Sequence, residues 1–205
     1  MTVTAAVLRR RIRLLVGATI AYNLVEAAVA LTAGGLASST ALIGFGLDSL
    51  VEVASASVVA WQFSVADPRR RERTALRLIA ISFFVLAAYV TVESVRALAG
   101  GAAADPSPVG IGLASVSLVV MPFLSLAQRR AGRAYGSASA VADSKQTLLC
   151  TYLSAVLLVG LVANAALGWW WADPVAALVI AGVAAREGRA AWRGDACCAD
   201  PACAD

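Results

Sequence analysis

The sequence predicts an all-α membrane protein with six transmembrane helices. Of its 205 residues, 60% are hydrophobic and 15% are charged, whereas soluble domains carry about 25% charged residues and are under half apolar. The apolar residues form six blocks of roughly 19–28 residues, each long enough to cross a bilayer as a helix. The segments between the blocks alternate between Arg-rich and free of Lys and Arg. Together these observations favour a multi-pass membrane protein over a soluble domain.

The apolar runs set the boundaries of the predicted spans, which are residues 12–33, 41–62, 75–98, 109–127, 139–166 and 173–191. The first follows four arginines, as a signal peptide would. It is too long for one, contains Asn23 and Glu26 and lacks a clear cleavage site, so we expect a retained helix. The second is apolar over about 41–59 except for two acidic residues. Near the outer end of the third, Glu93 and Arg96 have the i,i+3 spacing of an ion pair.

The last three spans carry different signals. Pro122 lies inside the fourth, where it should kink the helix. The fifth opens with SAVADSKQTLLC, a segment with several polar residues. Pro174 lies in the first turn of the sixth, where its missing N–H does no harm. Three consecutive tryptophans at 169–171 precede it, as expected at a membrane–water interface.

The basic residues predict the orientation of the spans. Arginines cluster at the N-terminus, in ADPRRRER after the second span, in AQRRAGRAYG after the fourth and at the end of the sixth. The other connections, GGLASST, GGAAADPSPVG and ALGWWWADP, have no Lys or Arg. The positive-inside rule therefore predicts cytoplasmic termini, with the plasma membrane as the expected location. Because the basic clusters lie between apolar blocks, they indicate topology and not nucleic-acid binding.

The strongest candidate for function is an acidic pair in the second span. Asp48 and Glu52 are one helical turn apart and share a face. An acidic side chain at mid-membrane costs about 2.5–3.5 kcal/mol on insertion scales. A bound proton or cation is the simplest compensation, and a structural pair between helices is the alternative.

The fifth span carries a matching polar stripe. Asp143, Gln146 and Cys150 have the spacing i, i+3 and i+7, and each offers a lone pair to a cation. Counted from the membrane edges, this stripe and the acidic pair lie at similar depths, as a shared four-ligand site requires. The alternatives are interior packing for Gln146 and Cys150 and helix N-capping for Asp143.

The first span contributes Asn23 and Glu26, also one turn apart near mid-depth. Such residues orient metal ligands by hydrogen bonding to them, accept protons or line an ion path. Hydrogen bonding between helices explains them equally well.

These segments resemble the cation diffusion facilitator family of metal/proton antiporters over nearly the whole chain. SSTALIGFGLDSLVEVAS resembles the second helix of that family, ADSKQTLLC its fifth and WWWADPVAALVIAGVAAREG its sixth. The resemblance maps the family's tetrahedral metal site onto Asp48, Glu52, Gln146 and Cys150, with Asp143 as the alternative to Gln146. Typical zinc members have His in this site, but this chain has none. Cys favours a thiophilic ion such as zinc, cadmium or copper, whereas carboxylates also suit manganese or iron.

The end of the sequence departs from the family pattern, in which a cytoplasmic domain binds metal and dimerises. We expect a transmembrane domain over 1–193, a short Cys-rich cytoplasmic tail over 194–205 and no large cytoplasmic domain. Cys197, Cys198 and Cys203 suit metal capture in a reducing cytoplasm, although a flexible tail with incidental cysteines is the alternative.

The resemblance implies a divalent metal transporter that exports zinc or a similar ion by proton antiport. The metal is its substrate, no cofactor is required, and the partners are metal, protons and the lipid bilayer. A homodimer is compatible with the resemblance, and the runs GLASS and GFG permit close helix packing within or between chains. The alternative function is a non-transporting metal sensor or partner subunit of the same family. An enzyme is disfavoured because no nucleophile–base pair is visible and no His is present.

Overall fold

The part of the chain that the structure describes, residues 3–64, 72–100 and 104–193 of a computed structural model, is built of helices without strands. These helices are α1 (Val3–Ala37), α2 (Thr40–Gln62), α3 (Glu72–Gly100), α4 (Pro108–Tyr135), α5 (Ala138–Leu167) and α6 (Ala172–Arg193). The predicted all-α fold is therefore confirmed. By length and composition, α1 to α5 are able to cross a membrane. Helix α6 is also long, but charged residues occupy both of its ends.

Two helices extend well beyond the predicted spans. Helix α1 begins at Val3 and includes the first Arg cluster, and α4 continues through AQRRAGRAY to Tyr135. The predicted loop after the fourth span is therefore wrong. The prediction followed apolarity, whereas Ala and Arg are good helix formers that continue a helix beyond the membrane. Gly136, with a φ of 73°, ends α4 in the left-handed conformation that glycine adopts readily. Ser137 then caps α5 by accepting a hydrogen bond from the Ala140 N–H at 3.3 Å.

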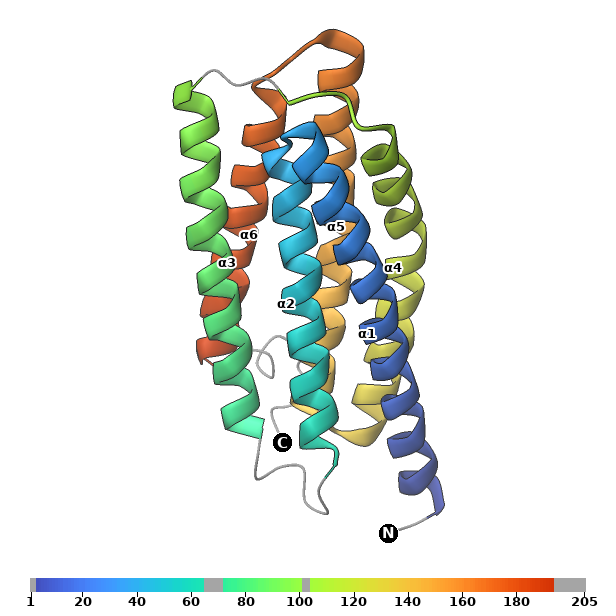
Figure 1. Cartoon of the computed structure of the whole chain (residues 1–205). Coiled ribbons are helices and arrows are strands. Elements are labelled where there is room, and N and C mark those ends of the chain that lie inside the picture. The colour runs from blue at the N-terminus through green and yellow to red at the C-terminus, as the bar shows by residue number, and fades with distance from the viewer. Residues whose placement is uncertain (1–2, 65–71, 101–103, 194–205) are drawn as a thin grey trace.

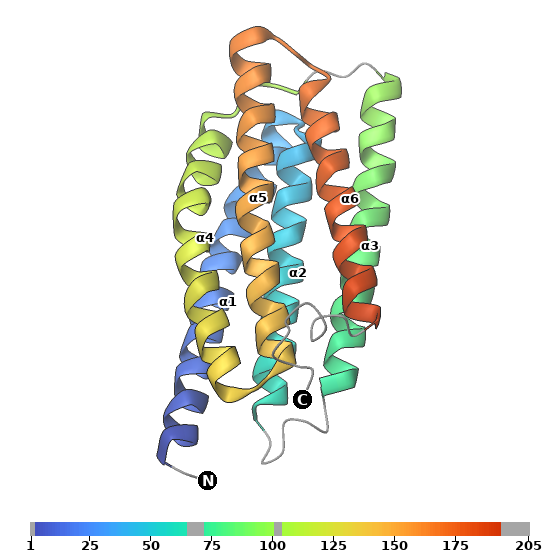
Figure 2. The same ribbon diagram turned by 180° about the vertical axis from the view of Figure 1, so that it is seen from behind.

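The bundle consists of a group of four helices and an adjoining pair. Helices α1, α2, α5 and α4 form a ring in which each packs against two of the others, while α3 packs along α6 and joins the group chiefly through α2. Figures 1 and 2 show α3 and α6 together on one side from both directions. Helix α2 contacts α1, α3, α5 and α6, so it holds a central place in the bundle. The acidic pair predicted from the sequence lies on this helix.

Close packing of α1 against α2 depends on glycine. A Cβ built at Gly46 would lie 2.9 Å from Cγ of Leu31 and 3.1 Å from Cβ of Ala30. Real side chains essentially never approach so closely, so a larger residue here would force the helices apart. This contact brings the following turns of α2 towards Glu26 on α1.

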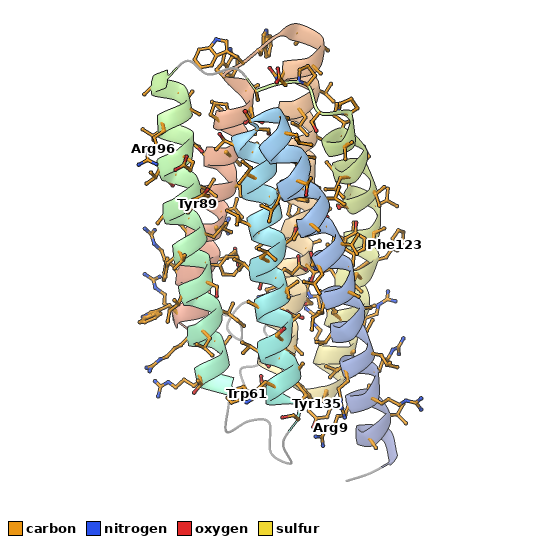
Figure 3. The ribbon with its side chains drawn as sticks, in the orientation of Figure 1. Arg9, Trp61, Tyr89, Arg96, Phe123 and Tyr135 are labelled. Atoms are coloured by element: carbon orange, nitrogen blue, oxygen red, sulfur yellow. The ribbon has the colours of Figure 1, made fainter. Side chains whose placement is uncertain are left out.

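The outer surface of the bundle is apolar. Phe123 on α4 is 72% exposed, and Val85 on α3 and Val119 on α4 are also exposed. Figure 3 shows Phe123 directed away from the bundle. Large apolar surfaces of this kind are rare on soluble monomers and fit contact with lipid.

The connections alternate between the two ends of the bundle. Figure 1 shows the α1–α2, α3–α4 and α5–α6 connections at one end, and the described chain begins and ends towards the other. This up-and-down order agrees with the alternation of Arg-rich and Arg-free segments in the sequence. The assignment of the Arg-rich end to the cytoplasm stays a prediction from charge.

At the Arg-rich end, side chains connect α1, α2 and α4. An Arg9 guanidinium nitrogen donates to the Phe63 carbonyl oxygen at 2.7 Å. The Phe63 ring packs against the Tyr135 ring with centroids 5.2 Å apart. Figure 3 shows Arg9 and Tyr135 near this end of the bundle.

At the opposite end, a carboxylate on α6 holds the N-terminus of α2. Oδ2 of Asp173 accepts a hydrogen bond from the Ala41 N–H at 3.1 Å, and Oδ1 accepts one from the Ser39 hydroxyl. Ser39 is itself the N-cap of α2 and accepts from the Leu42 N–H. A carboxylate also interacts favourably with the positive end of the helix dipole. The buried Asp173 therefore fixes α6 to α2.

Replacement of Asp173 by Ala should destabilise the bundle, because it leaves the Ala41 N–H and the Ser39 hydroxyl buried without this acceptor. We expect the free energy of unfolding in mixed micelles to fall by about 1.5–3 kcal/mol, as for loss of hydrogen bonds to a charged group. Glu93→Ala is the matched control. It breaks the predicted Glu93–Arg96 ion pair, which the structure confirms at 2.8 Å on the surface, and should cost under about 1 kcal/mol. Equal losses in the two variants would contradict this role of Asp173.

Candidate metal site

Polar side chains from four helices meet inside the otherwise apolar bundle. Helix α2 buries Asp48, Ser49, Glu52 and Ser55 over two turns, which keeps these residues on its inner side. The facing polar residues are all buried and comprise Thr19, Asn23 and Glu26 on α1, Ser117 and Gln128 on α4, and Asp143, Gln146, Thr147 and Cys150 on α5. The residues predicted from the membrane spans therefore share one interior.

Glu26 connects all four helices of the central group. Its Oε2 accepts a hydrogen bond from the Ser49 hydroxyl of α2 at 2.8 Å, and its Oε1 accepts one from the Ser117 hydroxyl of α4. The thiol of Cys150 on α5 lies 3.8 Å from Oε2 and donates towards it. The Tyr22 hydroxyl lies 2.9 Å from that of Ser117. Glu26 thus makes hydrogen bonds between helices, which was one of the interpretations that the sequence left open.

Asn23 behaves differently from Glu26. Its Nδ2 donates to the Thr19 carbonyl oxygen of the same helix at 3.0 Å. Its buried Oδ1 has no hydrogen-bond partner in the described part of the chain. The structure therefore gives Asn23 no hydrogen bond to another helix.

Asp143 is the centre of a second network, towards the Arg-rich end. Its Oδ1 accepts from the Ser55 hydroxyl, and its Oδ2 accepts from Nε2 of Gln128, both at 3.1 Å. The same nitrogen of Gln128 also donates to the Thr19 hydroxyl at 2.9 Å. The alternative that Asp143 caps a helix is wrong, because α5 begins at Ala138 and Ser137 is its N-cap. The Ser55–Asp143 hydrogen bond also places the polar stripes of α2 and α5 side by side.

Glu52 and Gln146 contrast with these satisfied groups. Glu52 is 0% exposed and Gln146 is 5% exposed, yet among the residues that the structure describes neither carboxylate oxygen of Glu52 and neither amide atom of Gln146 has a partner in good hydrogen-bond geometry. The carboxylates of Asp48, Asp143 and Glu26 are near enough to repel a charged Glu52. Buried polar groups without partners are rare and costly. Glu52 is therefore the buried acid that most needs a proton or a cation, and Gln146 has an amide oxygen available to a cation.

The positions of the predicted ligands are close but not convergent. Asp48 and Glu52 are buried on α2, and Asp143, Gln146 and Cys150 are buried on α5. Within residues 3–64, 72–100 and 104–193, however, no three Cys, Asp or Glu side chains stand close enough together to hold a metal ion. Cys197, Cys198 and Cys203 lie outside the described residues. The ligand set therefore stays a prediction.

Sequence reasoning missed the hydroxyl and amide partners. Ser49, Ser55, Ser117 and Gln128 supply most of the donors to Glu26 and Asp143. A signal was present on α4, where buried Ser117, Met121, Ser125 and Gln128 recur at intervals of three or four residues. That pattern marks an inward face with polar groups, although it does not show which acids they contact.

A family model described as the cation efflux transmembrane domain matches residues 16–192. The matched region contains every predicted ligand except the three cysteines near the end of the chain. A search of curated proteins finds no match.

Asp143 and Gln146 should respond in opposite ways to replacement. Asp143→Ala removes the acceptor for Ser55 and Gln128, so we expect the free energy of unfolding without metal to fall by about 1.5–3 kcal/mol. Gln146→Leu replaces an amide without partners by an apolar side chain of similar size and should be neutral or stabilising. Unfolding in mixed micelles measures both effects. A large loss in Gln146→Leu would show that its amide is satisfied in the folded protein.

Proposed function

The chain belongs to the cation efflux family, and we propose that it exports zinc or a similar thiophilic divalent ion from the cytoplasm in exchange for protons. Family membership makes it a metal cation transporter and not an enzyme. The family match and the long apolar helices identify it as an integral multi-pass membrane protein. The identity of the ion, the direction of transport and the coupling to protons are the proposal.

The observation that carries the proposal is the environment of Glu52. Within the described part of the chain, its two buried oxygens have no partner in good hydrogen-bond geometry, and they lie one helical turn from Asp48. The donors beside them, the Thr147 hydroxyl and the Cys150 thiol of α5, compensate the charge only weakly, so a carboxylate in this setting gains most from a proton or a metal ion.

The donor types favour a transition metal over calcium or magnesium. Cys150 is buried at the same level and interacts electrostatically with Asp48 and Glu52. A thiolate prefers zinc, cadmium or copper, whereas magnesium and calcium take oxygen ligands. Gln146, on the same face of α5, offers a neutral oxygen without another partner. This donor set supports zinc or a chemically similar ion.

The same chemistry supports coupling to protons. Carboxylates and thiols bind metal in their deprotonated forms, so binding releases protons and excess protons release the metal. Because this chain has no His, its titratable candidates for the site are acids. A site that holds either protons or a metal ion, but not both, is the requirement for exchange of the two across a membrane.

Asp48→Asn should abolish most metal uptake into proteoliposomes with the Arg-rich face outward, because the site loses one of its charged ligands. Uptake of zinc, recorded with an internal fluorescent indicator, measures the effect. Glu93→Gln is the matched control, since it removes an exposed carboxylate on another helix and should leave the flux unchanged. Undiminished zinc flux in Asp48→Asn would contradict the proposed site. Metal binding without flux in the wild-type protein would favour the sensor alternative.

Metal uptake should also move protons in the opposite direction. In the same liposomes, a pH-sensitive dye should report alkalinisation of the lumen when zinc enters, and an acidic lumen should accelerate zinc uptake. The dye signal should be absent from Asp48→Asn. Zinc flux without a pH change, and insensitive to the pH gradient, would contradict proton antiport while leaving metal transport intact.

A further inference from the structure

We propose that Glu26 of α1 binds the transported ion directly, together with Cys150 of α5, so that three helices contribute ligands. This inference rests on the proposed function, which places the ion beside Asp48 and Glu52. The family resemblance assigns ligands to the second and fifth spans only. The hydrogen-bonding position of Glu26 now gives it a role in the site itself.

The separation of the two ligand atoms fits a shared ion. Cys150 Sγ and Glu26 Oε2 are 3.8 Å apart. With a Zn–S bond of about 2.3 Å, a Zn–O bond of about 2.1 Å and a tetrahedral angle, the two ligand atoms would lie about 3.6 Å apart. The two atoms therefore need to move only slightly to coordinate one ion. They already have nearly the separation of two neighbouring ligands in a tetrahedral site.

The charges of Cys150 and Glu26 also favour a shared ion. Metal binding to Cys150 requires the thiolate, which would then lie beside the carboxylate of Glu26 in a buried, weakly screened environment. Two adjacent negative charges repel each other strongly there unless a cation lies between them. A divalent ion that both atoms bind turns this repulsion into attraction.

An independent observation places the remaining ligands nearby. Glu52 is fully buried with both oxygens unpartnered, and its charge interacts with those of Glu26 and Asp48. Glu52 also interacts with Cys150. A fully buried carboxylate that has no partner in good hydrogen-bond geometry and has the Cys150 thiol beside it marks where a further ligand would come from.

The serine contacts of Glu26 do not prevent coordination. Each carboxylate oxygen has more than one lone pair, so Ser49 and Ser117 can donate to Glu26 while it binds metal. Metal-binding carboxylates are commonly held by such hydrogen bonds, which orient them. The competing explanation is that Glu26 only organises the helices through these serines.

Two substitutions at Glu26 separate the explanations. Glu26→Asp keeps the charge but shortens the side chain, and Glu26→Gln keeps the length and a hydrogen-bond acceptor but removes the charge. If Glu26 is a ligand, metal affinity should fall in the order wild type, Asp variant, Gln variant. If it only accepts hydrogen bonds, the Gln variant should bind metal as well as the wild type and the Asp variant should be the weaker.

The measurement is cadmium binding to the full chain in lipid nanodiscs, followed by the ultraviolet absorbance of the cadmium–thiolate bond. Cys197, Cys198 and Cys203 are replaced by Ser in every variant, so that Cys150 is the only thiol left. Cys150→Ser should abolish the band. We expect Glu26→Gln to weaken binding by more than about 100-fold, beyond the 10–100-fold typical of residues that support ligands. The matched controls Ser49→Ala and Ser117→Ala should each weaken it by less than about tenfold.

Binding within about threefold of the wild type in Glu26→Gln would overturn the inference, and so would an equally large loss in Ser117→Ala. Thermal unfolding of each variant without metal checks that it is folded. If Glu26→Gln does not fold, Glu26→Asp is compared with Ser117→Ala at equal loss of metal-free stability: weaker cadmium binding in Glu26→Asp then supports the inference, and equal or tighter binding overturns it. Asp48→Asn distinguishes this failure from that of the proposed function, because unchanged cadmium binding in that variant would refute the site itself.

Discussion

The fold depends on how the carboxylates inside the apolar bundle are satisfied. An ionised side chain away from water must be paired or hydrogen-bonded, or its burial costs several kcal/mol. Glu26 meets this requirement with donors from α2, α4 and α5, and Asp143 meets it with donors from α2 and α4. These contacts tie the four central helices together at two levels. Because lipid is as apolar as the side chains it covers, apolar contacts alone do not determine how the helices pack together. These hydrogen bonds determine which helix faces meet.

Between these two levels lies the group that the protein leaves unsatisfied. Ser55 and Ser49 are on the same helix as Glu52, yet they donate to Asp143 and Glu26 instead. Glu52 thus keeps its oxygens available at a cost in stability, which is common at functional sites. Glu26 and Asp143, whose oxygens accept hydrogen bonds, hold α1, α4 and α5 around Glu52. Stability and transport therefore place opposite demands on neighbouring carboxylates of the same interior.

The sequence predicted the helices and their inner faces well, because both depend on local patterns. Asp48 and Glu52 stood out as acids in an apolar run, and their burial follows from that pattern alone. The function of Glu26 remained open because its partners belong to three other helices, and periodicity identifies a face without identifying its neighbour. Tyr135 illustrates a different limit. It ends a helix that continues past the apolar run. The end of an apolar run indicates where the helix leaves the membrane and does not indicate where the helix ends.

Because the chain has no His, the proposed site would carry more negative charge than a site that contains His. Imidazole binds metal as a neutral group, whereas thiolate and carboxylate bind as anions. A site of Asp48, Glu52, Cys150 and Glu26 would accumulate more negative charge than one divalent ion neutralises, in surroundings that screen charge weakly. Without metal, protons must neutralise these groups, and with metal any of these acids that does not coordinate the ion keeps its proton. Under the proposed exchange, the number of protons moved per ion is therefore set by how many of these acids ionise when the metal binds.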